Sequence, residues 1–518
     1  MKVRELLAHL GGIALFAVPG FALTGLFPGL RATPWLRRLG YGHLLGIAAL
    51  AGTLYALSAL LEVPLRRPAI FGTAAVLTAA GAAGWLRAWG RHEVHRHRRQ
   101  LPRRARLAAL LLALAGAGVS AGLFADALVF PLRDWDGRMH WSAQARYIRF
   151  EGSVLPLAVV RGQWYINHPR YPVLLPVAQT AVLEATGAGE DELFYRGLYA
   201  SFFPAFLLVL YDGAQRWAGW LAGGLATAAA AGIPFLTFFV DGGASGSYSD
   251  LPLACFYGAG LVLLLRGRVF PSDGPSDGPL DGMAAGLLLG AAVLTKNEGT
   301  ILAGFALLAA GLVPGLRLWM ARKGKLPAAA RRHLLLKGAR ACAAASVLVA
   351  ALAFFFYWRS QIPNRQDENY EERVTVGQFF PGAVTRIPEF GSRILFQTFL
   401  TWNRWIGFWW VALLVLLAGR GILKGRRAAL SWPILLGFAA PLAIAWGAYT
   451  VHWDPDELVK VTWERFLLQG SLPFFLLFSL ALREVLQRSF PGWRAGVGVD
   501  IAKERSVRRA VRTFPSRQ

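Results

Sequence analysis

Two carboxylates, Asp134 and Asp136, are separated by a single tryptophan in the stretch Arg133–Trp141. This stretch follows an apolar run, Leu107–Leu128, that is long enough to cross a bilayer. A carboxylate at the water boundary can ionise, accept a proton from a substrate or bind a cation. The same residues also fit a solvated loop whose tryptophans anchor it at the membrane interface. The stretch alone leaves both interpretations open.

A second group of candidates consists of charged residues at the ends of later apolar segments. Lys296 and Glu298 lie in a tight turn between two such segments, and Arg465 opens the last one. A lysine at bilayer depth is costly unless it is paired. One expectation is that Glu298 pairs with Lys296 and neutralises it. The other is that Lys296 and Arg465 together hold an anionic headgroup such as a phosphate. Asp250 and Arg196 begin two further segments and join the same candidate substrate-binding site.

The stretch His168-Pro169-Arg170-Tyr171-Pro172 is expected to be a turn, because proline interrupts helices. We include His168, Arg170 and Tyr171 in the candidate substrate-binding site. Asp136, Glu151 and His168 are candidates for a catalytic base.

A metal site would depend on Asp134 and Asp136. Carboxylates two residues apart do not share a helix face, so they could chelate a cation only from a loop. A divalent cation, Mg²⁺ or Mn²⁺, therefore remains an open expectation.

The amino-acid composition indicates what kind of secondary structure positions these residues. Of 518 residues, 55% are hydrophobic and only 16% charged, and the mean hydropathy is +0.41. A soluble globular domain cannot bury so much apolar surface, whereas a bilayer can cover it. The sequence therefore predicts an all-α polytopic membrane protein. Cys255 and Cys342 both lie in apolar segments, so neither a disulfide framework nor a thiolate metal site is expected.

Apolar runs of spanning length predict about 13 transmembrane segments. These are Leu6–Leu26, Tyr41–Leu61, Pro68–Trp89, Leu107–Leu128, Leu193–Tyr211, Trp217–Ile233, Leu251–Leu265, Leu280–Leu294, Thr300–Leu318, Ala341–Trp358, Thr398–Leu417, Leu430–Tyr449 and Phe466–Leu482. The run Val173–Ala185 is too short to span, which favours a re-entrant or interfacial helix. Ala143–Phe150 is amphipathic and is expected to lie in the interface.

The net charge of +25 would indicate nucleic-acid binding in a soluble protein. Here the basic residues gather between apolar runs, which is the positive-inside pattern, and no nucleic-acid partner is expected. The rule places the loops 91–106 and 319–340 inside, with the basic tail after Arg483. It places the loops 129–192 and 359–397 outside, together with the stretch His452–Glu464.

Four regions follow from this topology. Residues 1–106 form N-terminal spans with a basic cytoplasmic loop, and residues 107–318 form the core that carries the outer loop 129–192. Residues 319–482 form a C-terminal membrane region with the outer loop 359–397, and residues 483–518 form a basic cytoplasmic tail.

The order of these motifs resembles the GT-C superfamily of membrane glycosyltransferases, in the bacterial branches similar to protein O-mannosyltransferases and aminoarabinose transferases. Trp135-Asp136 followed by Trp141 and Ala145 is similar to an acidic motif of bacterial members, although Arg146 follows the alanine where those members have a lysine before it. The His-Pro-x-Tyr-Pro turn, the Ser-Asp pair before a span and the Thr-Lys turn fit the same pattern. The resemblance covers residues 107–318, and the C-terminal third only by topology.

The resemblance implies a GT-C-like helix bundle in the bacterial inner (cytoplasmic) membrane, with its active site facing the periplasm. It implies a polyprenyl-phosphate-linked sugar donor, membrane lipids as surroundings, and an acceptor that is an envelope lipid, glycan or protein. Asp136 occupies the position of the family's acidic motif, so the resemblance makes it the first choice for the catalytic base, ahead of Glu151 and His168. Asp134 would orient the acceptor or help to bind a cation.

Other functions stay open. A transporter or lipid flippase would also carry intramembrane charges and broken spans, although it would usually show an internal repeat, and we find none. A polymerase or ligase of surface polysaccharide is a further alternative, because it usually concentrates arginines in a late outer loop such as Arg359–Arg393. A non-catalytic membrane scaffold also remains compatible with the sequence.

Overall fold

Helices make up all of the regular secondary structure in the residues that the structure describes. The structure is a computed structural model of the 518-residue chain. It describes residues 3–89, 103–162, 168–187, 193–239, 242–266, 278–321, 328–363, 376–424 and 427–490. The predicted all-α fold is confirmed for these residues. The histidine- and arginine-rich stretch 91–99 lies outside them.

The N-terminal helices pack against each other through close backbone contacts. These helices are α1 (Val3–Leu23), α2 (Pro28–Arg31), α3 (Trp35–Leu61), α4 (Arg67–Trp89) and α5 (Arg103–Val129), with a 3₁₀ turn at Thr24–Leu26. Where α1 crosses α3, a Cβ atom on Gly46 would lie 1.9 Å from the carbonyl oxygen of Phe16. Only glycine fits there, and such small-residue crossings are typical of helix packing in membranes.

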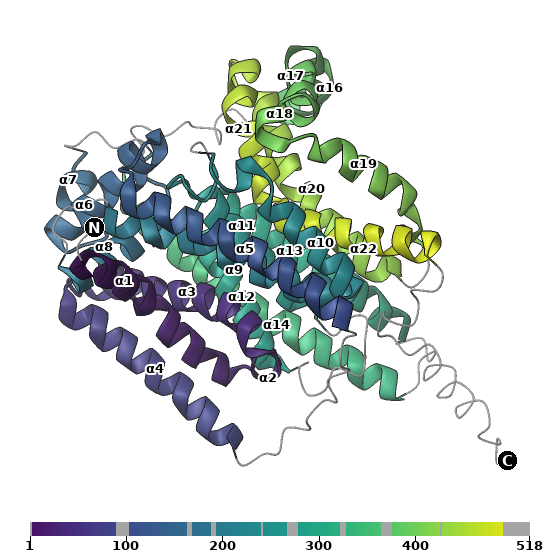
Figure 1. The fold of residues 1–518 in the computed structure, drawn as a ribbon. Coiled ribbons are helices and arrows are strands. Elements are labelled where there is room, and N and C mark those ends of the chain that lie inside the picture. Colours follow the sequence, from purple (N-terminus) through teal and green to yellow (C-terminus); the bar gives the residue numbers. More distant parts are fainter. Residues whose placement is uncertain are drawn as a thin grey trace.

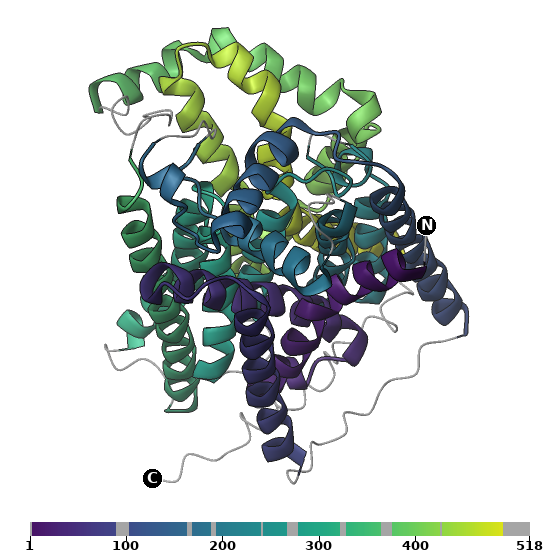
Figure 2. The ribbon, with the colours of Figure 1, turned by 90° about the vertical axis from the view of Figure 1, so that its left-hand side faces the viewer.

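The outer-loop region and the central helices follow. The first comprises a π-helical turn at Gly137–Trp141, α6 (Ser142–Glu151), α7 (Leu157–Val160) and α8 (Leu174–Thr186). The second comprises α9 (Leu193–Ala218), α10 (Trp220–Ala231), a 3₁₀ turn at Pro234–Leu236, α11 (Asp250–Leu265), α12 (Pro279–Val293) and α13 (Glu298–Ala321). Figure 2 shows α6 to α8 grouped beside the ends of the long helices.

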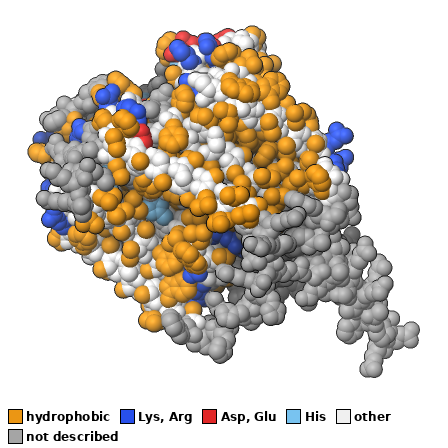
Figure 3. Space-filling view, in the orientation of Figure 1, with side chains coloured by type: hydrophobic (Ala, Val, Ile, Leu, Met, Phe, Trp, Pro, Cys, Tyr) orange, Lys and Arg blue, Asp and Glu red, His pale blue; other side chains and the backbone are white. Residues whose placement is uncertain are grey.

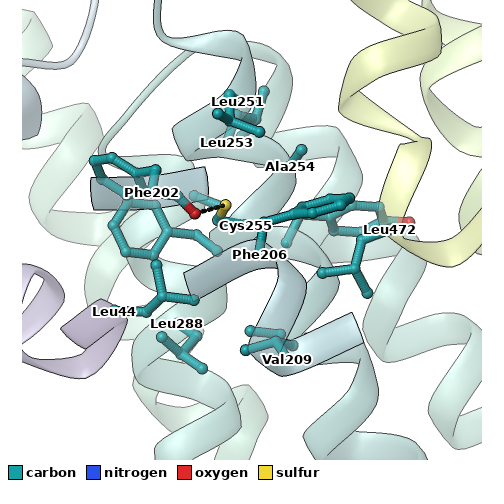
Figure 4. Packing of buried hydrophobic residues seen from close by; sticks show 14 of the residues in the cluster. Leu44, Phe202, Phe206, Val209, Leu251, Leu253, Ala254, Cys255, Leu288 and Leu472 are labelled. Carbon is teal, nitrogen blue, oxygen red and sulfur yellow. Dashed lines mark hydrogen bonds between the residues drawn. The ribbon is translucent and has the colours of Figure 1, made fainter. Parts of the chain in front are cut away.

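Helix α11 lies at the centre of the molecule (Figure 1), and all 16 of its residues are buried. Cys255 illustrates its surroundings (Figure 4): the thiol lies 3.5 Å from the carbonyl oxygen of Phe202 on α9, among side chains that include Phe206 and Leu472. A helix that is apolar on every side has to be enclosed by other helices or by lipid. Here helices enclose it, and its first residue, Asp250, is buried with it.

The C-terminal region combines long and broken helices. They are α14 (Ala328–Ser360), α16 (Val376–Thr385), α17 (Ile387–Phe399), α18 (Trp402–Trp405), α19 (Phe408–Ala418), a 3₁₀ turn at Arg420–Leu423, α20 (Ala428–Val451), α21 (Pro455–Gln469) and α22 (Ser471–Ser489). Helices α16, α17 and α18 and the start of α21 project together from one end of the molecule (Figure 1). The predicted outer segments 359–397 and His452–Glu464 therefore contain helices in their described parts.

Among the residues that the structure describes, seven helices are long and apolar enough to cross a membrane, and the pair α21 and α22 passes the same test with a bend of 58° between its halves. The same residues include five shorter apolar helices. Apolar side chains cover much of the surface seen in Figure 3, and charged ones form small groups on the projecting end and towards the edges of this face. These features support a multi-pass membrane protein. Helices occupy most of each of the 13 predicted segments, some of which contain a break, and the number of spans remains a prediction.

Two predicted segments differ from the observed helices. The run Thr398–Leu417 is interrupted, because Ile406 and Gly407 adopt positive φ of 46° and 69°, and a side chain on Gly407 would collide with Trp402. Only α19, with 11 residues, continues the apolar run. Arg465 does not open the last span but lies near the end of α21, before the bend at Gly470.

The topology can be tested with cysteine labelling in a Cys342→Ser background, since Cys255 is buried. Arg161→Cys lies on an exposed position of the predicted outer loop, and His97→Cys lies in the predicted cytoplasmic loop. A membrane-impermeant maleimide added to intact cells should label position 161 and leave position 97 unlabelled until the cells are lysed. The reverse pattern would invert the orientation.

Candidate functional site

Five of the charged residues selected from the sequence form one continuous chain of ion pairs. Arg465 donates from Nη2 to Asp136 and from Nε to Asp250, each at 2.8 Å. Lys296 lies 2.9 Å from the other oxygen of Asp250 and 3.0 Å from Glu298. We call Asp136–Arg465–Asp250–Lys296–Glu298 the ionic chain. Residues that the sequence analysis selected from separate segments therefore lie in direct contact.

Four separate segments supply the ionic chain. Asp136 directly precedes the π-helical turn at Gly137–Trp141, and Asp250 is the first residue of α11. Lys296 lies in the turn between α12 and α13, Glu298 is the first residue of α13, and Arg465 comes from α21. Long-range contacts of this kind fix the positions of the four segments relative to one another.

The exposure of the side chains to solvent changes along the ionic chain. The side chain of Asp250 is fully buried, and that of Lys296 is 6% exposed. Arg465 and Asp136 are more open, at 17% and 27%. Asp250 also accepts a hydrogen bond of 2.7 Å from Gln469, so its two oxygens have three charged or polar donors. A buried carboxylate is tolerated only when it is neutralised and hydrogen-bonded in this way.

Gln469 was not selected from the sequence, although a signal existed. It lies four residues after Arg465 on α21, so both side chains fall on one helix face. Tyr248 is a second contributor, because the guanidinium of Arg465 lies 4.6 Å from the centre of its ring. Gln469 thus helps to hold Asp250 in position, and Tyr248 helps to hold Arg465.

Several polar atoms around the ionic chain have no hydrogen-bond partner among the described residues. They are the hydroxyls of Ser247 and Ser249, Oε1 of Gln469 and Oε2 of Glu298. Buried polar atoms usually find a partner in protein, water or ligand. The surroundings of the ionic chain are therefore polar and offer acceptors and hydroxyls.

Asp134 does not join the ionic chain. One of its oxygens accepts the backbone N–H of Gly137 at 2.6 Å, and the other accepts that of Ser247 at 3.1 Å. A Cβ atom on residue 137 would lie 2.1 Å from this carboxylate, so Gly137 is needed for the close approach. Burial raises the pKa of Asp134 above its usual value, and the two N–H groups oppose that shift. Asp134 thus ties the stretch 134–137 to the loop before α11.

Arg196 also lies outside the ionic chain. Its guanidinium pairs with Asp126 at 2.9 Å and donates to the backbone oxygens of Asp126, Phe130 and Ser245. These contacts join α9 to the end of α5 and to the loop before α11. Arg196 therefore positions the segments that carry Asp134 and Asp136.

The predicted turn places His168 and Tyr171 in an aromatic cluster. Their rings stack with centroids 4.8 Å apart, and both contact His140, whose neighbour Trp141 stacks on Tyr171. His168 has a positive φ of 52°, and Tyr171 donates its N–H to the carbonyl of His168. Arg170 lies within this turn. The cluster packs beside the π-helical turn that follows Asp136, without an ion pair to the ionic chain in the described contacts.

The remaining candidate base, Glu151, accepts the backbone N–H of Leu157 at 2.5 Å and so holds the start of α7. Within the described residues, no group of three or more His, Cys, Asp or Glu side chains could hold a metal ion. The carboxylates named for a cation face different partners: Asp134 binds backbone amides, and Asp136 binds Arg465.

The chain was compared with protein-family models, curated proteins and solved structures, and nothing matches it. Function must therefore be argued from the site itself.

Asp134→Asn should destabilise the fold. Asparagine has one acceptor oxygen, so one of the two buried N–H groups would lose its partner, at a cost of about 1–3 kcal/mol. Because the folded-state pKa of Asp134 is raised, the cost of ionising it reduces the stability of the wild type as pH rises above the usual aspartate range. Thermal unfolding in detergent should show a lower midpoint for the variant, with a smaller difference at high pH. An unchanged midpoint would contradict this structural role.

Lys296→Ala should be more damaging, because it leaves Asp250 and Glu298 without their shared cation in a buried position. Removing one partner of a buried pair typically costs about 3–5 kcal/mol. The double variant Lys296→Met/Glu298→Gln removes one positive and one negative charge, so it should recover part of the loss. Unfolding midpoints of the two variants measure this. Equal stability of Lys296→Ala and the wild type would show that the pairs contribute nothing.

Proposed function

We propose that the protein is a membrane glycosyltransferase of the GT-C type, which moves a sugar from a polyprenyl-phosphate-linked donor to an extracytoplasmic acceptor. The acceptor would be a lipid, glycan or protein of the cell envelope, and the site would face the periplasmic side of a bacterial inner membrane. The observation that carries the proposal is the contact between Asp136 and Arg465 within the ionic chain.

Sugar transfer of this kind needs a base and a cation close together. The acceptor hydroxyl loses a proton as its oxygen attacks C1 of the sugar, and a carboxylate within hydrogen-bond reach accepts that proton. The bond from C1 to the phosphate oxygen breaks, and the leaving phosphate takes up negative charge that a fixed cation stabilises. Asp136 and Arg465 provide these two groups 2.8 Å apart, and both are partly exposed.

The other members of the ionic chain have supporting roles in this proposal. Asp250 holds Arg465 through Nε, and Lys296 compensates the charge of Asp250. Lys296 is buried between two carboxylates, so in this proposal it neutralises them and does not itself contact the ligand. The unpaired oxygens of Gln469 and Glu298 and the hydroxyls of Ser247 and Ser249 would suit a ligand rich in hydroxyl groups.

No step of this mechanism is assigned to a metal ion. Asp134 is occupied by backbone amides, and the cation beside Asp136 is already Arg465. A role for Mg²⁺ or Mn²⁺ would appear as loss of transfer with a chelator and recovery on adding the ion.

A transporter or lipid flippase is the second candidate, and the bend between α21 and α22 favours it. The bend of 58° lies at Gly470, next to Gln469 and one turn from Arg465. Broken helices beside intramembrane charges are typical of transporters. Proteoliposomes separate the two: a flippase would move the lipid between leaflets without releasing free polyprenyl phosphate.

The alternative of a surface-polysaccharide polymerase or ligase depends on the arginines in the predicted outer segment after Arg359. Two of them are already paired: Arg386 contacts Glu389, and Arg393 contacts Asp456. These pairs stabilise α17 against its neighbours, so nothing in them favours the alternative.

Asp136→Asn tests the proposed base. The amide keeps the size of the side chain but cannot accept the proton, so transfer should fall by about 10²–10⁴-fold. The measurement is release of free polyprenyl phosphate from a lipid-linked sugar in proteoliposomes, with an envelope extract supplying acceptors and the donor saturating.

Asp456→Asn is the matched control, because it makes the same change at an exposed carboxylate on the same helix as Arg465. It should retain near wild-type transfer. If Asp136→Asn also retains it, the base lies elsewhere, with His168 the next candidate. If no variant alters any transfer reaction, the transporter interpretation replaces the enzyme.

A further inference from the structure

The contact between Asp136 and Arg465 is the most accessible link of the ionic chain. Next to it, the contact between Arg465 and Asp250 involves a carboxylate with no exposed surface, and Lys296 is nearly as enclosed. Glu298, at the far end, is 16% exposed but is itself an anion, so an anionic ligand meets the most accessible cation of the ionic chain at Arg465, beside Asp136.

Arg465 is positioned independently of Asp136. Its Nε donates to Asp250 at 2.8 Å, and its guanidinium lies over the ring of Tyr248 at 4.6 Å. Loss of the contact to Asp136 would leave both of these in place. The guanidinium edge that faces Asp136 would then be a fixed donor for another anion.

Asp136 has no comparable second anchor. Arg465 is its one recorded hydrogen-bond partner among the described residues, and no backbone N–H caps its carboxylate there. This contrasts with Asp134, which two backbone N–H groups hold. The carboxylate of Asp136 can therefore move while the residues around it stay in position.

The net charge of the ionic chain determines whether an anion can bind to it without displacing one of its carboxylates. With all groups ionised, the ionic chain has three carboxylates and two cations, so its net charge is −1. An added anion would meet an already negative cluster and would be repelled. If Asp136 leaves, the four remaining charges balance, and the anion can bind Arg465 in its place.

We propose that a phosphate group binds Arg465 by displacing Asp136, so that ligand binding releases this carboxylate. The inference rests on the proposed function, in which the phosphate is that of the lipid donor and Asp136 is the base. Asp136 would then be held by Arg465 until the donor is bound, and it would become free to accept a proton only beside a bound phosphate. Donor binding would precede activation of the acceptor.

The exchange predicts an unusual effect of removing a carboxylate: the phosphate ligand should bind more tightly. In Asp136→Asn the competitor for Arg465 is neutral, so a short-chain polyprenyl phosphate should bind about three- to thirty-fold more tightly than to the wild type. Asp136→Glu keeps a competing carboxylate and should remain close to the wild type. Binding is measured on the purified full-length protein in detergent, by microscale thermophoresis.

Asp456→Asn controls for the change in overall charge and should bind like the wild type. Asp136→Ala is a second variant that removes the competitor, with the same expected gain, should the asparagine variant fold poorly. Weaker or unchanged binding in a folded variant without the Asp136 carboxylate would overturn the exchange while leaving the proposed function intact. Absence of binding by every variant, the wild type included, would overturn the proposed donor and the exchange with it.

The source of the phosphate is distinguished by a second ligand. Inorganic phosphate, titrated over the same concentrations, should bind at least ten-fold more weakly than the polyprenyl phosphate, because it gains no apolar contact. If the two bind equally and both tighten in Asp136→Asn, the exchange is supported, but the lipid donor is contradicted.

Discussion

The structure around the candidate site depends on one buried charge, the carboxylate of Asp250. It begins a helix whose 16 residues are all buried, so water cannot solvate it. Lys296, Arg465 and Gln469 neutralise and hydrogen-bond it instead. Each donor comes from outside α11, so satisfying one carboxylate brings the turn between α12 and α13 and the end of α21 onto the start of α11.

The other end of α11 is anchored by the same physical means. Arg266 follows its last residue and pairs at 2.6 Å with Asp212 of α9, a buried carboxylate that also contacts Arg37 and Arg216. A 16-residue helix is about 24 Å long, less than the ~30 Å apolar thickness of a bilayer. Ion pairs at both ends of α11 therefore determine its depth in the bilayer as well as the helices that pack against it.

The sequence predicted the members of the site better than their contacts. A position at bilayer depth marked Lys296 as costly unless paired, and Lys296 pairs with Glu298, as one of the two expectations had it, and also with Asp250. The pattern could not show that Asp134, two residues from Asp136, faces backbone amides, because one of the two belongs to Ser247, 113 residues later. The break at Ile406–Gly407 was also missed, since apolar composition continues through it and only the backbone conformation changes.

The same contacts bear on the choice between an enzyme and a transporter. Alternating access in transporters requires groups of helices to move against one another around the substrate site. Between α21 and α22, a Cβ atom on Gly470 would lie 3.0 Å from Pro441 and 3.1 Å from Phe438, so α20 packs closely against the bend. Arg465 and Gln469 bind α21 to the buried start of α11 just before it. Movement of α21 at this bend would separate the fully buried carboxylate of Asp250 from Arg465 and Gln469, which favours a fixed site and therefore the enzyme proposal.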